Sequence, residues 1–226
     1  MTIQIIGAGM AGLLAANMLR HRNPVVYEAQ PALPNNHSAV LRFRTSQVGD
    51  VLGIPFKRVN MIKTSDPWRN PVADALAYSY KNTGSFKSDR SILSGTTSDE
   101  RFIAPVDLVA RMADGVSIEF NSPFKRWFEE QHEPIISTIP MPGLMRALNY
   151  PDEPNFQARD GFNIRATIAD CDAYVSVYVP DPATQMSRVS ITGDQLIIEV
   201  PYAMPENAGA AGGLADMYVA HACALL

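Results

Sequence analysis

Cysteine is scarce in this chain of 226 residues, which has only Cys171 and Cys223. A zinc site usually needs closely spaced cysteine or histidine ligands, and the sequence has neither a CxxC pair nor a histidine cluster. We therefore expect no metal site. A disulfide between the two thiols is possible, but we expect both to be reduced and buried.

Long apolar runs and blocks of positive charge are also missing. No segment approaches the ~20 apolar residues of a membrane-spanning helix. The apolar start of the chain lacks the basic flank of a signal peptide and is interrupted by Gly7, Gly9 and Gly12. The net charge is −4, without the basic stripe typical of nucleic-acid-binding proteins. We expect a cytoplasmic protein with a small-molecule substrate and with neither nucleic-acid nor membrane partners; its oligomeric state stays open.

Hydrophobic residues make up 46% of the chain, which is enough for a sizeable core. Residues 3–6 predict a short buried strand, and apolar residues at helical spacing predict a helix from Met10 to about His21. Residues 25–28 predict a second strand, whose apolar run is typical of a parallel strand covered on both faces. Strand, helix and strand predict a right-handed βαβ unit and an α/β fold.

A GxGxxG motif occupies the turn between the first predicted strand and the helix. In this context the first glycine permits a tight turn, the second lets the backbone approach a pyrophosphate, and the third lets the helix pack against the strand. The start of the helix offers free N–H groups to phosphates. The motif consists of Gly7, Ala8, Gly9, Met10, Ala11 and Gly12.

Glu28 ends the second predicted strand. A carboxylate at this position can accept hydrogen bonds from both ribose hydroxyls of an adenosine, and it would repel the 2′-phosphate of NADP. The spacing of the glycines and the position of Glu28 therefore predict a Rossmann-type dinucleotide-binding site. Both FAD and NAD are compatible with it.

Residues 3–28 resemble the N-terminal fingerprint of FAD-dependent oxidoreductases of the glutathione-reductase-like superfamily. Ala16 and Leu19 fall where that fingerprint has an alanine and a leucine, and Glu28 is followed by Ala29, as in flavoproteins. Residues 135–142 are similar to a strand and Thr-Ile-Pro stretch of the amine-oxidase-like and UDP-galactopyranose-mutase-like branch. The chain would be a short or divergent member, since most members are much longer.

The resemblance implies FAD as the cofactor, with NAD as the alternative. It implies that the strand at 116–120 leads to an adenine contact near Phe124, and that the strand before Thr138 returns to the glycine loop. Arg42 or Arg44 can replace the family's missing arginine at the pyrophosphate, because a guanidinium binds phosphate through two hydrogen bonds. The expected cofactor-binding residues are Gly7, Ala8, Gly9, Met10, Ala11, Gly12, Glu28, Ala29, Arg42, Arg44, Phe124 and Thr138.

The expected architecture is a discontinuous FAD/NAD(P)-binding domain with a smaller antiparallel-sheet substrate lobe. The FAD-binding domain is predicted to comprise 1–60, 97–148 and 205–226, and the lobe to comprise 61–96 and 149–204. Residues 37–44 are compatible with a strand, and residues 60–100 read as a loop-rich excursion. Gly193-Asp194 predicts a hairpin turn between two strands.

No catalytic residue is identified, because a flavin supplies its own redox chemistry and needs no dedicated nucleophile. Tyr174, Ser176 and Tyr178 alternate along one predicted strand, so they share a face. With Arg188 they can bind an anionic or sugar-like substrate, and His37 is a candidate proton carrier. The leading hypothesis is an FAD-dependent oxidoreductase. An NAD-binding enzyme or sensor, and a non-catalytic relative that binds a nucleotide, are the alternatives.

Overall fold

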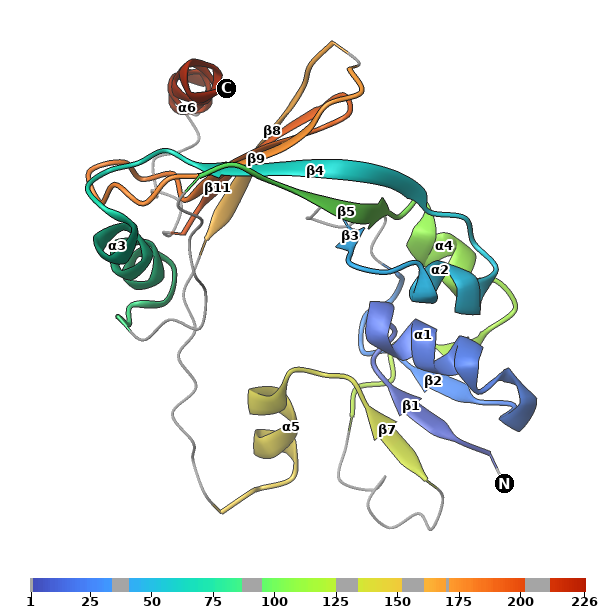
Figure 1. Ribbon diagram of the computed structural model, residues 1–226. Coiled ribbons are helices and arrows are strands. Elements are labelled where there is room, and N and C mark those ends of the chain that lie inside the picture. The colour runs from blue at the N-terminus through green and yellow to red at the C-terminus, as the bar shows by residue number, and fades with distance from the viewer. Residues whose placement is uncertain are drawn as a thin grey trace. The chain divides into compact units, whose positions relative to one another are not determined.

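The computed structural model describes residues 2–33, 41–86, 95–124, 134–151, 161–169, 171–201 and 212–226. The chain forms two compact units, each assembled from two separate stretches. Unit 1 consists of Met1–Lys57 and Phe102–Phe156, and unit 2 consists of Arg58–Arg101 and Gln157–Leu226. The chain therefore passes from one unit to the other three times (Figure 1).

Unit 1 is built on a parallel sheet with the strand order β6-β2-β1-β7. Its strands are β1 (Gln4–Ile6), β2 (Val25–Tyr27), β6 (Ser117–Glu119) and β7 (Ile135–Ser137). Its helices are α1 (Met10–Met18), the 3-10 turn η1 (Arg20–Arg22), α2 (Gln47–Leu52), α4 (Leu108–Ala113) and α5 (Met141–Ala147). The predicted succession of strand, helix and parallel strand at residues 3–28 is confirmed, and so is the α/β class.

The core of unit 1 forms where the short strands meet α1 and α4. Ile5 and Val26 are buried in neighbouring strands, and Leu13 of α1 and Met112 of α4 belong to the same cluster. Asn17 links the two helices, because its side-chain amide donates to the carbonyl oxygen of Met112 at 2.7 Å. Burial of these apolar side chains is the main force that holds three-residue strands in register.

Unit 2 contains a mixed sheet with the order β5-β4-β9-β10-β11-β8. Its strands are β4 (Lys57–Ser65), β5 (Thr97–Ile103), β8 (Phe162–Thr167), β9 (Tyr174–Tyr178), β10 (Arg188–Thr192) and β11 (Gln195–Val200). β4 and β9 run parallel, whereas β9, β10, β11 and β8 are antiparallel. The predicted hairpin at Gly193 joins β10 and β11. The last two residues of β5, Phe102 and Ile103, belong to unit 1 and pair there with β3 (Arg42–Phe43).

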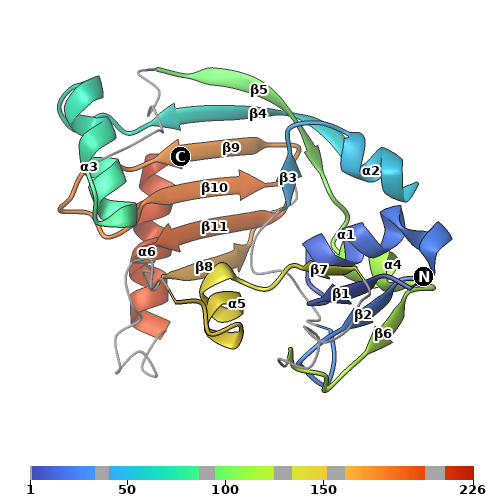
Figure 2. The ribbon, with the colours of Figure 1, turned by 90° about the horizontal axis from the view of Figure 1, so that it is seen from below.

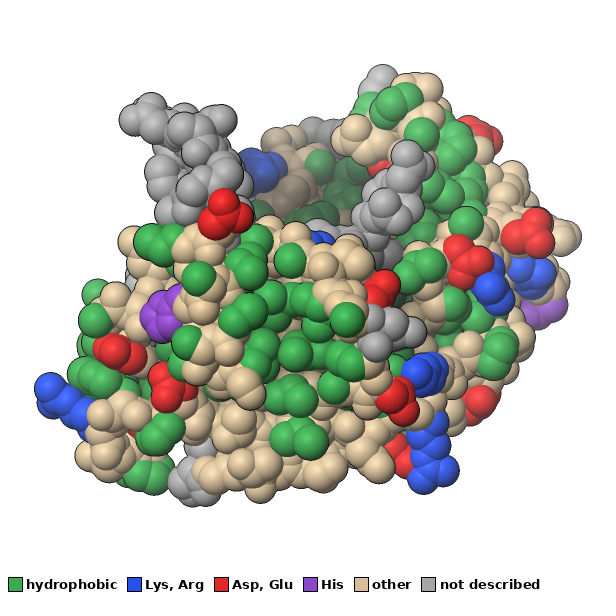
Figure 3. Space-filling model, turned by 90° about the horizontal axis from the view of Figure 1, so that it is seen from above, with side chains coloured by type: hydrophobic (Ala, Val, Ile, Leu, Met, Phe, Trp, Pro, Cys, Tyr) green, Lys and Arg blue, Asp and Glu red, His purple; other side chains and the backbone are tan. Residues whose placement is uncertain are grey.

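The two faces of the unit 2 sheet differ in composition. Helix α6 (Gly212–Leu225) packs its Tyr218 and Ala222 against an apolar face that includes Val189 and Ile198. Figure 2 shows the sheet in front of α6, and Figure 3, which looks from the side of α6, shows hydrophobic side chains gathered there. Because side chains alternate along a strand, the opposite face receives the polar residues of β9 and β10.

The expectation of a loop-rich excursion at residues 60–100 is wrong. This stretch contains most of β4, the start of β5, and helix α3 (Pro71–Thr83). Asn70 and Pro71, which read as breakers, begin the helix. Asn70 is its N-cap, and its side chain accepts a hydrogen bond from the Ala73 N–H at 3.0 Å. Proline is favoured at the first helical position, because its missing N–H has no acceptor there in any case.

Three further expectations differ from the structure wholly or in part. The segment 205–226 was assigned to the FAD-binding domain, but its described part, α6, belongs to unit 2. Of the possible strand at 37–44, residues 37–40 lie outside the described structure, and β3 covers two residues. Both cysteines are free, but Cys223 is exposed and Cys171 is half-buried, so the expectation of two buried thiols is wrong. Within the described ranges, no helix is long and apolar enough to cross a bilayer.

Candidate functional site

Two glycines of the 7–12 loop are required by the packing of unit 1. Gly7 has φ +96°, a left-handed conformation that side chains disfavour, and a Cβ there would lie 2.9 Å from Thr138 Oγ1. A Cβ at Gly12 would lie 1.9 Å from the carbonyl oxygen of Gly7. The turn and the close approach of α1 to β1 therefore need glycine at both positions, as the motif predicts.

Gly9 differs from both, because no atom of the described residues explains its identity. Its φ of −70° is accessible to any residue, and within the described part of the chain no heavy atom lies within 4 Å of the position that a Cβ would take. Gly9 is exposed and is the N-cap of α1, with no side-chain hydrogen bond at the cap. The N–H groups that begin an α-helix have no acceptor within it, so they are available to a ligand that approaches Gly9.

Glu28 reaches from the end of β2 to the glycine loop. One carboxylate oxygen accepts from the Ala8 N–H at 2.8 Å, and the other accepts from the Gln30 N–H at 2.9 Å. Each oxygen of an ionised carboxylate can accept a further hydrogen bond. Glu28 is therefore fixed in position and keeps acceptor capacity for a hydroxyl group. Its neighbour Ala29 is exposed.

The loop after β6 lies beside Glu28. The Ser122 N–H donates to the Glu28 carbonyl at 2.8 Å, and the Asn121 N–H donates to the Gln30 carbonyl at 3.1 Å. Asn121 has φ 56°, which turns the chain at this point. Three residues after Asn121 the chain reaches Phe124, so the segment predicted to contact adenine follows directly from a turn whose backbone is hydrogen-bonded to that of Glu28.

Thr138 secures the glycine loop from β7. Its hydroxyl lies 2.9 Å from the Ile6 carbonyl oxygen and 3.1 Å from that of Gly7, and its N–H donates to Ile6. A hydroxyl has one proton, which these two carbonyls share. The direct effect of Thr138 on the site is thus to position the loop.

Arg42 and Arg44 lie on and just after β3. Leu41 and Phe43, which alternate with them, pack against the core of unit 1, so Arg42 is directed to the other side of the strand. Arg42 is half-buried and Arg44 is exposed. Their contact with a pyrophosphate stays a prediction.

The polar face of the unit 2 sheet brings together the residues proposed for substrate binding. Register pairs Tyr174, Ser176 and Tyr178 of β9 with Thr192, Ser190 and Arg188 of β10. The prediction that the three β9 side chains share a face is confirmed, and the register places Arg188 on the same face. Both serines are buried, with their Oγ atoms 2.8 Å apart. His37 lies outside the described residues.

Arg188 is held by neighbours that the sequence did not single out. It forms an ion pair with Glu199, its partner in register on β11, and its guanidinium lies 5.9 Å from the centre of the Tyr178 ring. Its Nε is buried without a hydrogen-bond partner among the described residues. Tyr78 of α3 packs edge-on against Tyr178, with ring centres 5.6 Å apart.

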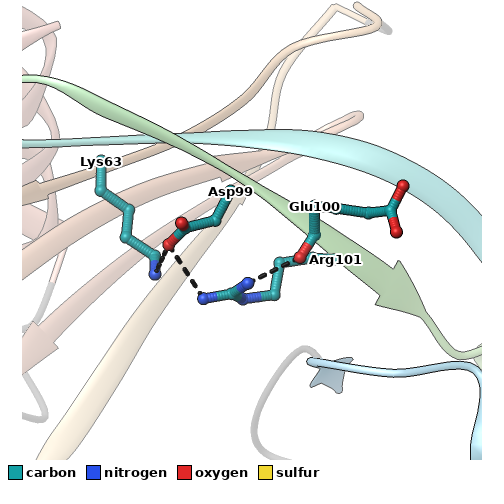
Figure 4. Close-up of polar contacts among 4 residues, drawn as sticks. All are labelled: Lys63, Asp99, Glu100 and Arg101. Atoms are coloured by element: carbon teal, nitrogen blue, oxygen red, sulfur yellow. Dashed lines mark hydrogen bonds and ion pairs between the residues drawn. The ribbon is translucent and has the colours of Figure 1, made fainter.

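A second charged cluster on unit 2, at β4 and β5, was missed by sequence reasoning. Lys63 Nζ lies 2.5 Å and Arg101 Nη2 lies 3.0 Å from the same Asp99 carboxylate oxygen (Figure 4). The hydrogen bond and charge of Lys63, aided by Arg101, hold the pKa of the Asp99 carboxyl below its usual value. The spacing of Asp99 and Arg101, two residues apart, is the signal in the sequence, but it indicates a shared face only if this segment is a strand, and residues 60–100 are predicted to be rich in loops.

Lys81 of α3 is a buried lysine in unit 2. Its ammonium group donates to the carbonyl oxygens of Val179 at 3.0 Å and Asp181 at 2.8 Å. Burial lowers the pKa of Lys81 to about 8, although the Asp181 carboxylate acts in the opposite direction. Lys81 therefore anchors α3 to the chain that follows β9.

Known proteins of similar structure come from several sources. An oxidoreductase from Methanosarcina mazei is 11% identical with a TM-score of 0.58, and the match covers 97% of this chain and 83% of that one. CtdE in complex with FAD is 11% identical with a TM-score of 0.55, covering 91% and 60%. Klebsiella pneumoniae HpxO complexed with FAD and uric acid is 16% identical with a TM-score of 0.54, covering 92% and 58%.

No protein-family model matches the sequence, and no curated protein matches it either. At identities of 11–16%, the structural likeness is one of fold. This chain spans about three fifths of the length of the two structures that hold FAD. This chain thus shares its fold with an oxidoreductase and with two proteins whose structures contain FAD.

Proposed function

We propose that this protein is an FAD-dependent oxidoreductase, with a Rossmann-type site in unit 1. The observation that carries the proposal is Gly9: it is a glycine that packing does not require, at the uncapped start of α1. A ligand whose phosphates approach the backbone there supplies the missing reason for glycine. FAD is favoured over NAD by the resemblance of residues 3–28 to flavoprotein fingerprints and by the FAD in CtdE and HpxO.

The residues of unit 1 fit the adenosine diphosphate part of FAD by their chemistry. The N–H groups at the start of α1 would bind the pyrophosphate, aided by the positive end of the helix dipole. Glu28 would accept hydrogen bonds from the ribose, and the segment up to Phe124 would line the adenine. When bound, the flavin supplies the transfer of electrons or hydride to and from a small organic substrate.

An absorption spectrum tests the proposal. The purified protein is incubated with FAD and passed through a gel-filtration column, and retained absorbance at the flavin wavelengths is expected. A protein that retains no flavin but binds NADH in a fluorescence titration would support the NAD-binding alternative. Retained flavin that none of the candidate substrates reduces would support a non-catalytic relative.

The Gly9→Ala substitution tests the role of the glycine. A methyl group there meets no atom of the residues that the structure describes, so the loss of stability should stay below about 1 kcal/mol, the usual scale for a cap change. If the pyrophosphate lies against this backbone, the same methyl group should weaken FAD binding at least about tenfold, which corresponds to 1.4 kcal/mol. FAD affinity is measured by quenching of flavin fluorescence, and stability by thermal unfolding.

Gly143→Ala is the matched control. Gly143 also has no atom within 4 Å of a Cβ position and lies in unit 1, but in α5 rather than in the glycine loop. Its substitution should leave FAD affinity unchanged. Equal FAD affinities for the Gly9 variant and the unaltered protein would remove the main support for the proposed site.

A further inference from the structure

The two faces of the β4–β5 pair in unit 2 carry different charge balances. On one face Arg58 forms an ion pair with Glu100, one cation with one carboxylate. On the other face Lys63 and Arg101 share the single carboxylate of Asp99. Figure 4 shows the latter three side chains close together, with the Glu100 side chain directed away from them. Asp99 and Arg101 are two residues apart on a strand, which places them on one face and Glu100 on the other.

Exposure separates the two groups further. The Arg58 and Glu100 side chains are 75% and 41% exposed, so water accounts for most of the stabilisation of their charges. The Lys63 and Arg101 side chains are 19% and 15% exposed. A positive charge that is mostly removed from water and lacks its own counterion costs free energy. Among the described residues of this cluster, one positive charge is left over.

The surroundings of the cluster are partly polar and partly apolar. Lys63 pairs in register with Ser176, whose hydroxyl meets that of Ser190 on the next strand. Val59 and Met61, which share the face of Lys63 along β4, are buried. Arg188 adds no charge to the surplus, because Glu199 balances it. A compound with one anionic group and a partly apolar body fits this combination.

We propose that Lys63 and Arg101 bind the carboxylate or phosphate group of a small organic anion on the polar face of the unit 2 sheet. The ammonium and guanidinium groups have N–H donors beyond those bound to Asp99 and to the Glu100 carbonyl. Asp99 holds the two cations next to each other, and the anion neutralises the remaining charge. The inference rests on the proposed function in one respect, since the anion would be the substrate or product of the flavin reaction.

Isothermal titration calorimetry on the full chain tests this site with three probes: benzoate, phenyl phosphate and the neutral benzamide. At least one of the two anions is expected to bind, at least about tenfold more tightly than benzamide. The tighter of the two identifies the preferred anionic group. If neither anion binds saturably at tens of millimolar, the proposal is overturned.

Substitutions of opposite sign sharpen the test. Lys63→Gln and Arg101→Gln each leave a balanced cluster, so each should weaken anion binding about tenfold. Asp99→Asn raises the surplus charge and should tighten binding, an outcome that simple structural damage would not produce. Arg58→Gln is the matched control. It removes a cation from β4, the strand of Lys63, but from the opposite face, so the affinity for the anion should stay unchanged.

Folding and flavin binding are followed separately. Circular dichroism checks that each variant is folded, and Arg101→Lys, which keeps the charge, should retain affinity within about threefold of the unaltered protein. Anion affinities that are insensitive to Lys63→Gln and Arg101→Gln, or are weakened by Asp99→Asn, would refute the site. Because FAD retention is read from the absorption spectrum, loss of the flavin proposal and loss of the anion site give different results.

Discussion

Lys81 shows how one buried residue can set the response of a whole unit to pH. Its ammonium group is bound by two carbonyl oxygens and is shielded from water, and burial brings its pKa down to about 8. In the unfolded chain a lysine titrates near its ordinary value of about 10.4. Between these two values the unfolded state binds more protons than the folded state, so stability rises as the pH rises through this window.

The Lys81→Met variant should lose this increase in stability with pH. From pH 7 to pH 9.5 the contribution of Lys81 to the free energy of unfolding is expected to grow by about 2 kcal/mol. Urea unfolding of the unaltered protein and of the variant at both pH values measures the difference, in which the titration of the tyrosines cancels. Lys57→Met, at an exposed lysine, is the control and should show no such change. Parallel pH dependences for the unaltered protein and the Lys81 variant would contradict the assignment.

Glycine illustrates what residue-level prediction can and cannot do. The spacing of Gly7, Gly9 and Gly12 predicted the turn and the close helix correctly, because both are local consequences of the missing side chain. The motif assigns each glycine a role in advance, but only coordinates show that Gly7 and Gly12 are enclosed by protein atoms and that Gly9 is not. Likewise, the position of Glu28 was predictable, whereas its hydrogen bonds to Ala8 and Gln30 were not.

Helix α3 is the element for which local sequence signals pointed both ways. Asn70, Pro71 and Gly84 resemble loop residues in isolation, but each has a regular role at a helix end: N-cap, first residue and left-handed C-cap. Asp74 completes the N-terminus from within, accepting from the N–H groups of Trp68 and Arg69. The polar composition of the helix surface hid its apolar periodicity, so the element was missed.

The cap makes a direct prediction for α3. Asn70→Ala removes the acceptor of the Ala73 N–H and should destabilise unit 2 by about 1 kcal/mol. For a chain of this size the melting temperature should fall by about 2–4 °C. Differential scanning calorimetry measures the shift, with Asn60→Ala, an exposed asparagine of β4, as the control. Equal melting temperatures for the Asn70 and Asn60 variants would show that the cap contributes nothing.

Local sequence signals predicted strand pairing only where the partners are close in sequence; the return of β7 to β1 was implied by the family resemblance instead. The β10–β11 hairpin followed from its glycine turn, and the β1–β2 pair followed from the crossover helix. β4 instead pairs in parallel with β9, with Ile62 opposite Val175. No local pattern specifies a partner more than a hundred residues away. The charge balance of the β4–β5 faces likewise becomes visible only once β4 and β5 are known to be neighbouring strands.

At the scale of the molecule, the two proposed sites belong to different units. The glycine loop lies in unit 1, and the Lys63–Arg101 cluster lies in unit 2. A division into two discontinuous regions was expected, but with α6 in the FAD-binding part. Its exclusion from unit 1 follows from the contacts of Tyr218 and Ala222 with the apolar face of the unit 2 sheet, which the helix sequence alone does not identify.

Hydrogen exchange of the whole chain should therefore distinguish the two ligands. FAD is expected to slow exchange most at residues 9–12, where backbone N–H groups lack acceptors within the helix. Benzoate is expected to slow exchange most in β4 and β5, where its anionic group would tie the two strands together. Mass spectrometry of peptides from the exchanged protein locates both effects. Maximal protection by FAD in peptides that exclude the glycine loop would contradict the assignment to unit 1.

The hydrogen bonds of Thr138 have a consequence for how this protein folds while it is being synthesised. Thr138 stands 131 residues after Gly7, whose carbonyl it contacts. At translation rates of about 5–20 residues per second, the glycine loop waits roughly 7–26 s for the strand that secures it. During that time β1 lacks β7 on one side, so the N–H and C=O groups along that edge are open to pairing with other chains. The cell's chaperones are therefore expected to matter most for this protein before residue 138 has emerged.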